Sequence, residues 1–416
     1  MRVKLSERLA DKPAATEAAA IIENCVHCGF CTATCPSYQV LDNELDSPRG
    51  RIYLIKQMLE GAQAAAPTRD HLDLCLTCRS CESTCPTGVQ YGRLVDIGRA
   101  MANEQAPRTA GSRLYRSLVR RTLLARPVFA GALRSGRALR PLLPKAVARR
   151  IPLAQVAGAW PAPRHARKAI ALDGCVQPAL APQIDAALAR VLDRAGISLI
   201  HVALSGCCGA VSQHLDAPQD ALQRARRNID AWWPHVESGA EAIVATSSGC
   251  GSMLKEYGHL LRDDPAYADK AARVSELVQD SAQLVARHWG ELRPQLLPVQ
   301  ADTAIAFQSP CSLQHGLKVR GVAEKLLVEM GYTVKPVADA HLCCGSAGTY
   351  SLLHADVAAQ LRTRKLAALE ADAPRQILSA NIGCIVHLQA ATDTPVRHWI
   401  EVLDERLQQS GKQECP

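Results

Sequence analysis

Cysteine is the residue type whose spacing most clearly predicts chemistry in this chain. Two segments, CVHCGFCTATCP from Cys25 to Pro36 and CLTCRSCESTCP from Cys75 to Pro86, share the spacing C-x-x-C-x-x-C-x-x-x-C-P. The first three thiolates of such a segment let one loop wrap three iron corners of a cubane cluster, with backbone N–H groups turned toward the cluster sulfides. The fourth cysteine lies too far along the chain to close the same cube easily, and its proline turns the chain away. The spacing therefore predicts two iron–sulfur clusters.

The same spacing occurs in bacterial two-cluster ferredoxins, where the fourth cysteine of each motif binds the neighbouring cluster. The expected ligands of the first [4Fe–4S] cluster are Cys25, Cys28, Cys31 and Cys85. Those expected for the second are Cys75, Cys78, Cys81 and Cys35. A pair of structural zinc sites is the alternative, but zinc ribbons use two separated pairs of ligands and not three closely spaced thiols before a prolyl fourth.

A second pattern places two cysteines side by side before a glycine, as SGCCGA at residues 205–210 and as HLCCGS at residues 341–346. Neighbouring cysteines rarely form a disulfide with each other, because the bond needs well-separated Cα atoms and a specific torsion. In each copy a single cysteine lies 32 positions before the pair, and a Gly-Cys follows it after 42 or 40 positions. The two sets are Cys175, Cys207, Cys208 and Cys250, and Cys311, Cys343, Cys344 and Cys384.

These matched spacings indicate an internal repeat. We expect the four thiols of each copy to converge on one redox or metal site. The alternative is that they are buried cysteines used as small apolar residues. That alternative suits one CCG segment better than two with matched partners.

The elements that must position these cysteines alternate between strand and helix. Short apolar runs precede the cysteines at residues 169–172, 198–204, 242–246, 304–307, 332–337 and 376–380. Amphipathic helices are expected between some of them, at residues 321–331 and 356–369. Strand–helix alternation predicts parallel sheets, and ligands of such sheets gather at the carboxyl ends of the strands. Each set of four cysteines is therefore expected at one sheet edge.

Between the first two motifs, residues 47–60 have the marks of one helix. Ser47 suits the N-cap, Pro48 suits the first turn and Gly61 suits the stop. An apolar stripe at helical spacing would pack inward, and it consists of Ile52, Ile55, Met58 and Leu59. A helix here favours an α-helical ferredoxin-like domain over a compact β-rich ferredoxin.

The composition fits a folded chain in a reducing compartment. The chain has 416 residues, of which 48% are hydrophobic and 21% charged, and it has 17 cysteines. Residues 1–24 are studded with charge and do not resemble a secretory leader, and no apolar run reaches the ~18 residues of a membrane span. We expect a cytoplasmic protein with metal or redox chemistry. Peripheral attachment to the cytoplasmic face of the inner membrane is an open alternative.

The expected fold class is mixed, with an N-terminal α-helical ferredoxin-like domain followed by two repeated α/β domains that have small parallel sheets. The expected bounds are 1–104 for the ferredoxin-like domain, 105–168 for a basic helical linker, and 169–297 and 298–416 for the two CCG domains.

The linker region is strongly basic. Residues 105–172 hold 15 of the 48 Lys and Arg residues and no Asp or Glu. A solvated spacer is one interpretation, and docking to an acidic partner or to anionic lipid headgroups is another. Nucleic-acid binding is disfavoured, because aromatic interleaving is lacking.

The CCG repeats resemble the cysteine-rich domains of the heterodisulfide reductase family. The order of two ferredoxin motifs and two CCG domains resembles the iron–sulfur subunits of flavin-linked hydroxy-acid and glycerol-3-phosphate dehydrogenases. The segments SPRGRIYLIKQ, LTCRSCESTCPTGVQYGRLVDIGR, CCGSAGTYSLL and SANIGCIVHLQ, with the ending TPVRHWIEVLD, are especially similar to glycolate oxidase iron–sulfur subunits.

This resemblance implies an electron-transfer subunit with two [4Fe–4S] clusters. It would pass electrons from a flavoprotein that oxidises glycolate to glyoxylate to a quinone or another acceptor. The chain departs from the fullest CCG pattern, which ends in C-x-x-C, because Ser247 precedes Cys250 and Asn381 precedes Cys384 at those positions. Each CCG site has lost one thiolate, which leaves two alternatives, a further cluster of another type or a vacant site.

Three other interpretations stay open. They are the equivalent subunit of a D-lactate or anaerobic glycerol-3-phosphate dehydrogenase, a heterodisulfide reductase-like thiol–disulfide enzyme, and a non-catalytic iron–sulfur scaffold. The sequence has no G-x-G-x-x-G after a strand and no nucleophile–base constellation. We therefore expect no catalytic residues in this chain and place the flavin on a partner.

Overall fold

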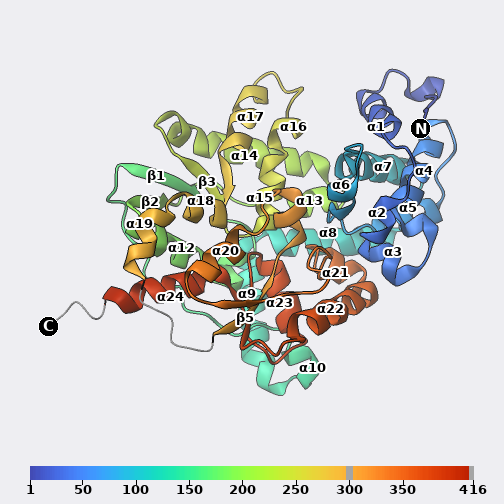
Figure 1. The fold of residues 1–416 in the computed structure, drawn as a ribbon. Helices are drawn as coiled ribbons and strands as arrows, with labels where there is room; N and C mark the ends of the chain where they lie inside the picture. The colour runs from blue at the N-terminus through green and yellow to red at the C-terminus, as the bar shows by residue number, and fades with distance from the viewer. Residues whose placement is uncertain (297–302, 412–416) are drawn as a thin grey trace. The chain divides into compact units, whose positions relative to one another are not determined.

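The computed structural model describes residues 1–296 and 303–411 (Figure 1). The chain packs as two compact units. The first consists of Met1–Ser117 and His341–Lys365, and the second consists of Leu118–Ala340 and the segment that starts at Leu366. The predicted boundary between residues 297 and 298 lies outside the described residues, and the other predicted domain bounds stay predictions.

The first unit is helical. Residues 1–117, all of which are described, contain no strand. Its elements are η1 (Glu7–Leu9), α1 (Pro13–Glu23), α2 (Phe30–Ala33), α3 (Pro36–Leu41), η2 (Glu44–Asp46), α4 (Pro48–Leu59), α5 (Ala66–Asp73), α6 (Ser80–Thr84), α7 (Tyr91–Gln105), the start of α8 (Ala110–Leu124), α21 (Tyr350–Leu353) and most of α22 (Ala355–Glu370). The prediction of an α-helical ferredoxin-like domain is confirmed.

The helix predicted at residues 47–60 is α4. The Ser47 hydroxyl accepts a hydrogen bond from the backbone N–H of Gly50 at 2.9 Å, which caps the helix. Gly61, just beyond the end, has φ +104°, a conformation that favours glycine. The predicted stripe of Ile52, Ile55, Met58 and Leu59 is buried in the core of this unit. Local capping and apolar spacing therefore explain this helix.

The second unit contains two parallel four-stranded sheets of the same topology, in the orders β2-β1-β3-β4 and β6-β5-β7-β8. The strands are β1 (Arg167–Ala171), β2 (Ile197–Ile200), β3 (Ala242–Ala245), β4 (Val278–Asp280), β5 (Ala304–Gln308), β6 (Thr333–Lys335), β7 (Gln376–Ser379) and β8 (Val396–His398). In the first sheet Ala169 lies opposite Leu199 and Ala242, and in the second Ala306 lies opposite Lys335 and Ile377. The predicted repeat of small parallel sheets is confirmed.

Helices surround these sheets. They are α11 (Gln177–Leu180), α12 (Pro182–Arg194), α13 (Ala210–His214), α14 (Pro218–Glu237), α15 (Ser248–Lys255), α16 (Tyr257–Leu260), α17 (Ala268–Leu277), α18 (Ser281–Arg287), α19 (Trp289–Leu292), η4 (Arg293–Gln295), the π-helical turn η5 (Ser312–Gly316), α20 (Val322–Glu329), α23 (Ile382–Gln389) and α24 (Trp399–Gly411). In both sheets the strand order reverses beside the inner strand, β1 or β5. Such a switch point is where ligands of open parallel sheets bind.

The basic segment is helical in part. It forms α8, α9 (Arg126–Leu139), η3 (Arg140–Leu142) and α10 (Lys145–Ala148), whereas residues 151–166 contain no helix and β1 begins at Arg167. The linker bounds of 105–168 stay a prediction. None of the residues of α9 is buried. Within the described ranges, no helix is both long enough and apolar enough to cross a membrane.

Candidate iron–sulfur sites

The two ferredoxin motifs adopt the same backbone at matching positions. His27 (φ +58°) and Gly29 (φ +84°) of the first correspond to Thr77 (φ +52°) and Arg79 (φ +59°) of the second. Non-glycine residues seldom adopt this left-handed conformation, and such strain gathers at functional loops. The backbone N–H of Thr77 donates to the Cys75 Sγ at 3.4 Å, so at least one amide is turned toward a thiol.

One open cavity collects the four thiols predicted for the first cluster. Its lining includes Cys25, Cys28 and Cys31 of the first motif and both Cys81 and Cys85 of the second. Cys28 is exposed, whereas the other three are half-buried. All four members of the crossed set thus line one cavity, but Cys81 of the other set lines it as well, so the assignment of ligands to clusters stays a prediction.

The set predicted for the second cluster lies deeper. Cys35, Cys75 and Cys81 are buried, and Cys78 is half-buried. Burial, followed by the charges of Cys78, Cys75 and Cys35, raises the pKa of the Cys81 thiol well above its ordinary value. Cys81 therefore has all three other members of its predicted set as electrostatic neighbours.

Cys35 is a neighbour of the first set as well. Burial, followed by the charges of Cys25, Cys35 and Cys28, raises the pKa of the Cys31 thiol to about 11. Eight thiols packed this closely would be unfavourable as thiolates without cations between them, and cluster irons supply such cations.

Residues in and just after the second motif fit a cluster. Of the described residues, Ser80 and Tyr91 have buried hydroxyl groups without a hydrogen-bond partner. Both lie in or beside the second motif, where cluster sulfides or thiolates would accept from them. The described ranges contain no group of three or more His, Cys, Asp or Glu side chains placed to bind a single metal ion. A cubane does not need such a group, because each of its irons takes only one thiolate.

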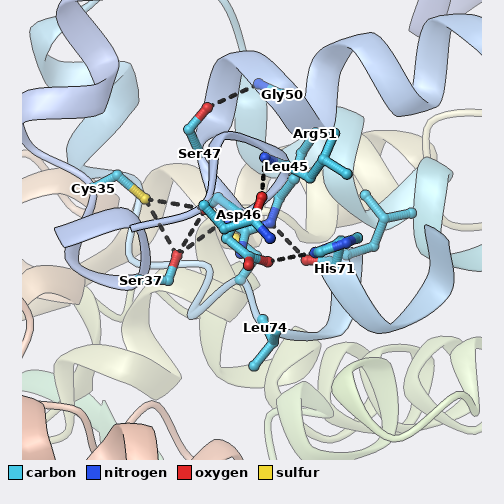
Figure 2. Close-up of polar contacts among 12 residues, drawn as sticks. Cys35, Ser37, Leu45, Asp46, Ser47, Gly50, Arg51, His71 and Leu74 are labelled. Carbon is cyan, nitrogen blue, oxygen red and sulfur yellow. Dashed lines mark hydrogen bonds and ion pairs between the residues drawn. The ribbon is translucent and has the colours of Figure 1, made fainter. Parts of the chain in front are cut away.

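A buried polar network reaches the second set through Cys35, as Figure 2 shows. The Ser37 Oγ lies 3.3 Å from the Cys35 Sγ, and the Arg51 Nη1 donates to the Ser37 Oγ at 3.1 Å. Arg51 pairs with the Asp46 carboxylate at 3.4 Å, and the His71 Nδ1 lies 2.9 Å from the same carboxylate oxygen. A buried cationic side chain is thus connected to a predicted cluster ligand through a single hydroxyl group.

The first CCG site also gathers its four predicted cysteines. The hydrogen bond with Cys207, followed by burial, raises the pKa of Cys175. Hydrogen bonds with Cys207 and Cys250, followed by burial, raise the pKa of Cys208. The thiols thus form a continuous chain of contacts. They follow β1, β2 and β3, so they lie at the carboxyl ends of neighbouring strands, as expected.

The four cysteines predicted for the second CCG site belong to different units, and each pair is described within its own unit. Cys343 and Cys344 belong to the first unit and are buried, and the N–H of Gly345 donates to the Cys343 Sγ at 3.4 Å. Cys311 and Cys384 belong to the second unit, where Cys384 is buried in α23. The convergence of these four residues stays a prediction.

The two positions that lack the expected cysteine contact each other inside the second unit. The Ser247 hydroxyl donates to the Asn381 Oδ1 at 2.7 Å, and the Asn381 Nδ2 donates to the Cys384 Sγ at 3.2 Å. The N–H of Ser248 also donates to the Ala380 carbonyl at 3.2 Å. These residues connect the two repeats instead of supplying a fifth thiolate to each site.

Sequence reasoning missed Arg51, Asp46 and Tyr91 as residues of the site. Arg51 is the one with a signal in the sequence, because it directly precedes the apolar stripe of α4. The structure shows that it is fully buried. Asp46 and Tyr91 reach the motifs through tertiary packing, which spacing along the chain does not reveal.

The comparisons with known proteins agree with this geometry. A family model described as a 4Fe-4S dicluster domain matches residues 21–89, and a cysteine-rich domain model matches residues 170–255 and 305–389. The glycolate oxidase iron-sulfur subunit of Escherichia coli is 50% identical over 98% of this chain and 100% of its own length. The chain belongs to the family of glycolate oxidase iron–sulfur subunits.

More distant relatives lie in the same family or beside it. A probable glycolate oxidase iron-sulfur subunit of Bacillus subtilis is 28% identical over 88% of either chain. Lactate utilization protein A of Bacillus licheniformis is 26% identical over 56% of this chain and 97% of its own length.

Proposed function

We propose that this chain is the electron-transfer subunit of a complex that oxidises glycolate to glyoxylate, carrying electrons from a flavoprotein subunit to a quinone or another acceptor. The cavity lined by Cys25, Cys28, Cys31, Cys81 and Cys85 carries the proposal, because it brings thiols of both ferredoxin motifs to one site. The similarity to the Escherichia coli subunit supports glycolate as the substrate of the complex.

The division of labour follows from the electron count. Oxidation of glycolate releases two electrons and two protons, and the partner's flavin accepts them together. A bound [4Fe–4S] cluster accepts and releases one electron at a time. Cysteines for two such clusters on one small helical unit let this chain drain a two-electron donor in two steps. The chain alone is expected to leave glycolate unchanged.

The ligand assignment is part of the proposal. Cys25, Cys28, Cys31 and Cys85 hold one cluster, and Cys75, Cys78, Cys81 and Cys35 hold the other. The test is anaerobic purification with iron and sulfide analysis and EPR during stepwise reduction. About eight irons per chain correspond to the two ferredoxin sites. A clearly higher iron content means that the CCG cysteines hold a further cluster.

Crossed ligation makes a sharper prediction. Cys35→Ser should damage the cluster formed mainly by residues 75–81, and Cys85→Ser should damage the cluster formed mainly by residues 25–31. EPR of each variant separates the two signals. The assignment is wrong if each variant loses the cluster of its own motif instead.

The flavoprotein is proposed to dock at the first cluster site. Cys28 is exposed there, and the apolar side chains beside it, Val26 and Phe30, are 64% and 61% exposed. Exposed apolar residues around a ligand loop suit a redox partner, since electron transfer needs close approach and desolvation. Phe30→Asp should slow cluster reduction by the reduced flavoprotein and leave reduction by dithionite unchanged. Equal slowing with both reductants would contradict this docking site.

Electrons are proposed to leave the second cluster toward the CCG motif of the same unit. The Tyr350 hydroxyl donates to the Leu74 carbonyl at 3.3 Å, directly before Cys75. Burial raises the pKa of Tyr350, with the charges of Cys75 and Cys343 contributing in the same direction. Tyr350 is therefore near a predicted ligand of the second cluster and near the CCG pair. In the assembled complex, Cys343→Ser should slow quinone reduction but not reduction of a dye that takes electrons from the flavin.

The basic segment is proposed to dock the partner or the anionic membrane surface on the cytoplasmic side. Leu139, Leu142 and Val156 are 53%, 82% and 88% exposed along it, among exposed arginines such as Arg134 and Arg150. Apolar residues among cations suit an anionic interface.

Arg120 is a poor probe of this surface, because its guanidinium lies 3.9 Å from the Asp220 carboxylate within the second unit. Charge reversal should instead be made at Arg121, Arg134 and Arg150, which are exposed. The association should weaken most at low salt, where attraction is least screened. Binding of the partner and of anionic vesicles that stays unchanged at every ionic strength would contradict the electrostatic role.

A lactate-oxidising complex is the second candidate, since the lactate utilization proteins cover the chain in part. Their identity of 26% and 24% is about half that of the glycolate relative. Rates of the purified complex with glycolate and with D-lactate distinguish the two, and turnover of small disulfides by this chain alone would favour the thiol–disulfide alternative.

A further inference from the structure

Arg51 is a cation placed where the surrounding protein gives it little compensation. Its side chain is 1% exposed. The guanidinium donates through Nε to the His71 carbonyl at 2.7 Å and through Nη1 to the Ser37 Oγ at 3.1 Å. Its contact with the Asp46 carboxylate is a single one, at 3.4 Å (Figure 2). The Arg51 charge is thus distributed over a backbone carbonyl, a hydroxyl and one distant carboxylate oxygen.

Such a pair is not explained by stability. Desolvating two ions costs several kcal/mol each, and replacing a buried pair with apolar residues of similar volume is often neutral or stabilising. The groups that act electrostatically on Arg51 include two predicted ligands of the second cluster, Cys75 and Cys35, in addition to the Asp46 carboxylate. The Arg51 charge therefore lies close enough to the ligands to interact with an additional electron on the cluster.

Ser37 extends this influence to a ligand atom. Its hydroxyl donates to the Asp46 carbonyl at 3.2 Å, and its Oγ lies 3.3 Å from the Cys35 Sγ. An iron-bound thiolate has no proton to donate, so in the loaded site we expect the Ser37 hydroxyl to turn its single proton from the Asp46 carbonyl to Cys35. Arg51 donates to the same Oγ and polarises the hydroxyl toward the sulfur. Hydrogen bonds to ligand sulfurs and nearby charge are both among the factors that set cluster potentials.

We propose that Arg51 and Ser37 raise the reduction potential of the cluster bound by Cys75, Cys78, Cys81 and Cys35, and that the Asp46 charge opposes them. These are positioning residues that act on the cluster through its ligands. The inference rests on the proposed ligand set. It means that the second site holds its electron more tightly than the same cysteines would alone, which directs electrons inward from the exposed first site.

Redox titration followed by EPR tests this through the signs of three shifts. In Arg51→Gln the ratio of reduced to oxidised second cluster, at the wild-type midpoint, should fall at least tenfold, which is a shift of about 59 mV for one electron. Ser37→Ala should lower the midpoint by less. Asp46→Asn should raise it, because the opposing charge is removed while Arg51 stays.

Arg49→Gln is the matched control. Arg49 lines the cavity of the first set, but its side chain is 32% exposed and pairs with Glu44. Solvent screens this charge, so the second midpoint should not move and the first should move little. Iron content and the EPR signal of the first cluster report whether each variant is intact.

Opposite shifts in Arg51→Gln and Asp46→Asn could not come from general structural damage. The proposal is overturned if the second midpoint is unchanged in Arg51→Gln with both clusters present, or if Asp46→Asn lowers it. Should Arg51→Gln fail to fold, Ser37→Ala and Asp46→Asn still decide the question by their signs. A wild-type chain without a second EPR-active cluster would contradict the proposed function instead, so the two failures are distinguishable.

Discussion

Alanine at the glycine of each CCG motif should be tolerated unequally. Gly209 has φ +94° and Gly345 has φ +90°, so both positions impose the same backbone strain on any other residue. The space for a Cβ differs. At Gly209 the added carbon would lie 3.2 Å from the Ala221 carbonyl oxygen, whereas at Gly345 it would lie 2.6 Å from the Ala358 carbonyl oxygen and 2.9 Å from the Leu361 Cβ.

The two contributions can be estimated separately. A left-handed backbone costs a non-glycine residue roughly 1–2 kcal/mol. Gly209→Ala should therefore destabilise its surroundings by about this amount, because a contact of 3.2 Å needs only a small adjustment. Gly345→Ala meets backbone of α22, which has to move, and overpacking of this kind adds about 1–3 kcal/mol. The expected total is about 2–5 kcal/mol.

Hydrogen–deuterium exchange measures both effects locally. The free energy of opening is obtained for amides of α13 and α14 in Gly209→Ala and for amides of α21 and α22 in Gly345→Ala. Tryptophan fluorescence is an additional probe for Gly209, since all five tryptophans lie in its unit. Equal losses in the two variants, or a larger loss at Gly209, would refute the reasoning from Cβ contacts.

Three further predictions concern residues around the sites. Burial raises the pKa of Asp280 to about 7 from an ordinary 3.8, so the contribution of this carboxyl to stability should be largest below about pH 4 and be lost as the pH rises through 7. Asp280→Asn keeps the Oδ1 that accepts from the Ala282 N–H at 2.8 Å, and urea titration at pH 8 should find it more stable by up to about 4 kcal/mol. An unchanged pH profile would contradict this. Asn381→Ala should cost about 1–2 kcal/mol in the same assay, since it removes the bonds to Ser247 and Cys384, without loss of iron from the ferredoxin motifs. Tyr91→Phe should lower the midpoint potential of a ferredoxin cluster in EPR titration, and unchanged midpoints would mean that its hydroxyl donates to no cluster atom.

Much of the fold could be predicted from local signals. The helix at Pro48–Leu59 follows from its cap and apolar stripe, and each of the six predicted strands precedes one of the cysteines of the repeat. The strands β4 and β8 were not predicted. Each has three residues and is followed by no cysteine motif, so neither length nor chemistry marks it.

The rest depends on packing between distant segments. The basic block predicts a charged surface, yet Arg108 and Arg116 of that block both pair with Asp73 of the ferredoxin-like region and are largely buried. The pairing of Ser247 with Asn381 likewise joins residues from separate repeats. The sequence identifies these residues as charged or polar, but tertiary structure decides which of them remain available to a partner.

Three loops of this chain use the same local device to hold a sulfur. The N–H of Thr77 donates to the Cys75 Sγ, that of Gly209 to the Cys207 Sγ and that of Gly345 to the Cys343 Sγ, each at 3.4 Å. In every case the donor follows the cysteine by two positions and has a positive φ.

Thr77 shows that this contact does not require glycine. The glycine of the CCG motif is instead favoured by a later helix that packs against it, strictly at Gly345, where a Cβ would lie 2.6 Å from the Ala358 carbonyl oxygen of α22, and less strictly at Gly209, where it would lie 3.2 Å from the Ala221 carbonyl oxygen of α14. This also accounts for the adjacent cysteines. The N–H of the glycine fixes the first sulfur, and the close approach of the helix fixes the backbone of the second, so two neighbouring thiols are oriented without a disulfide between them.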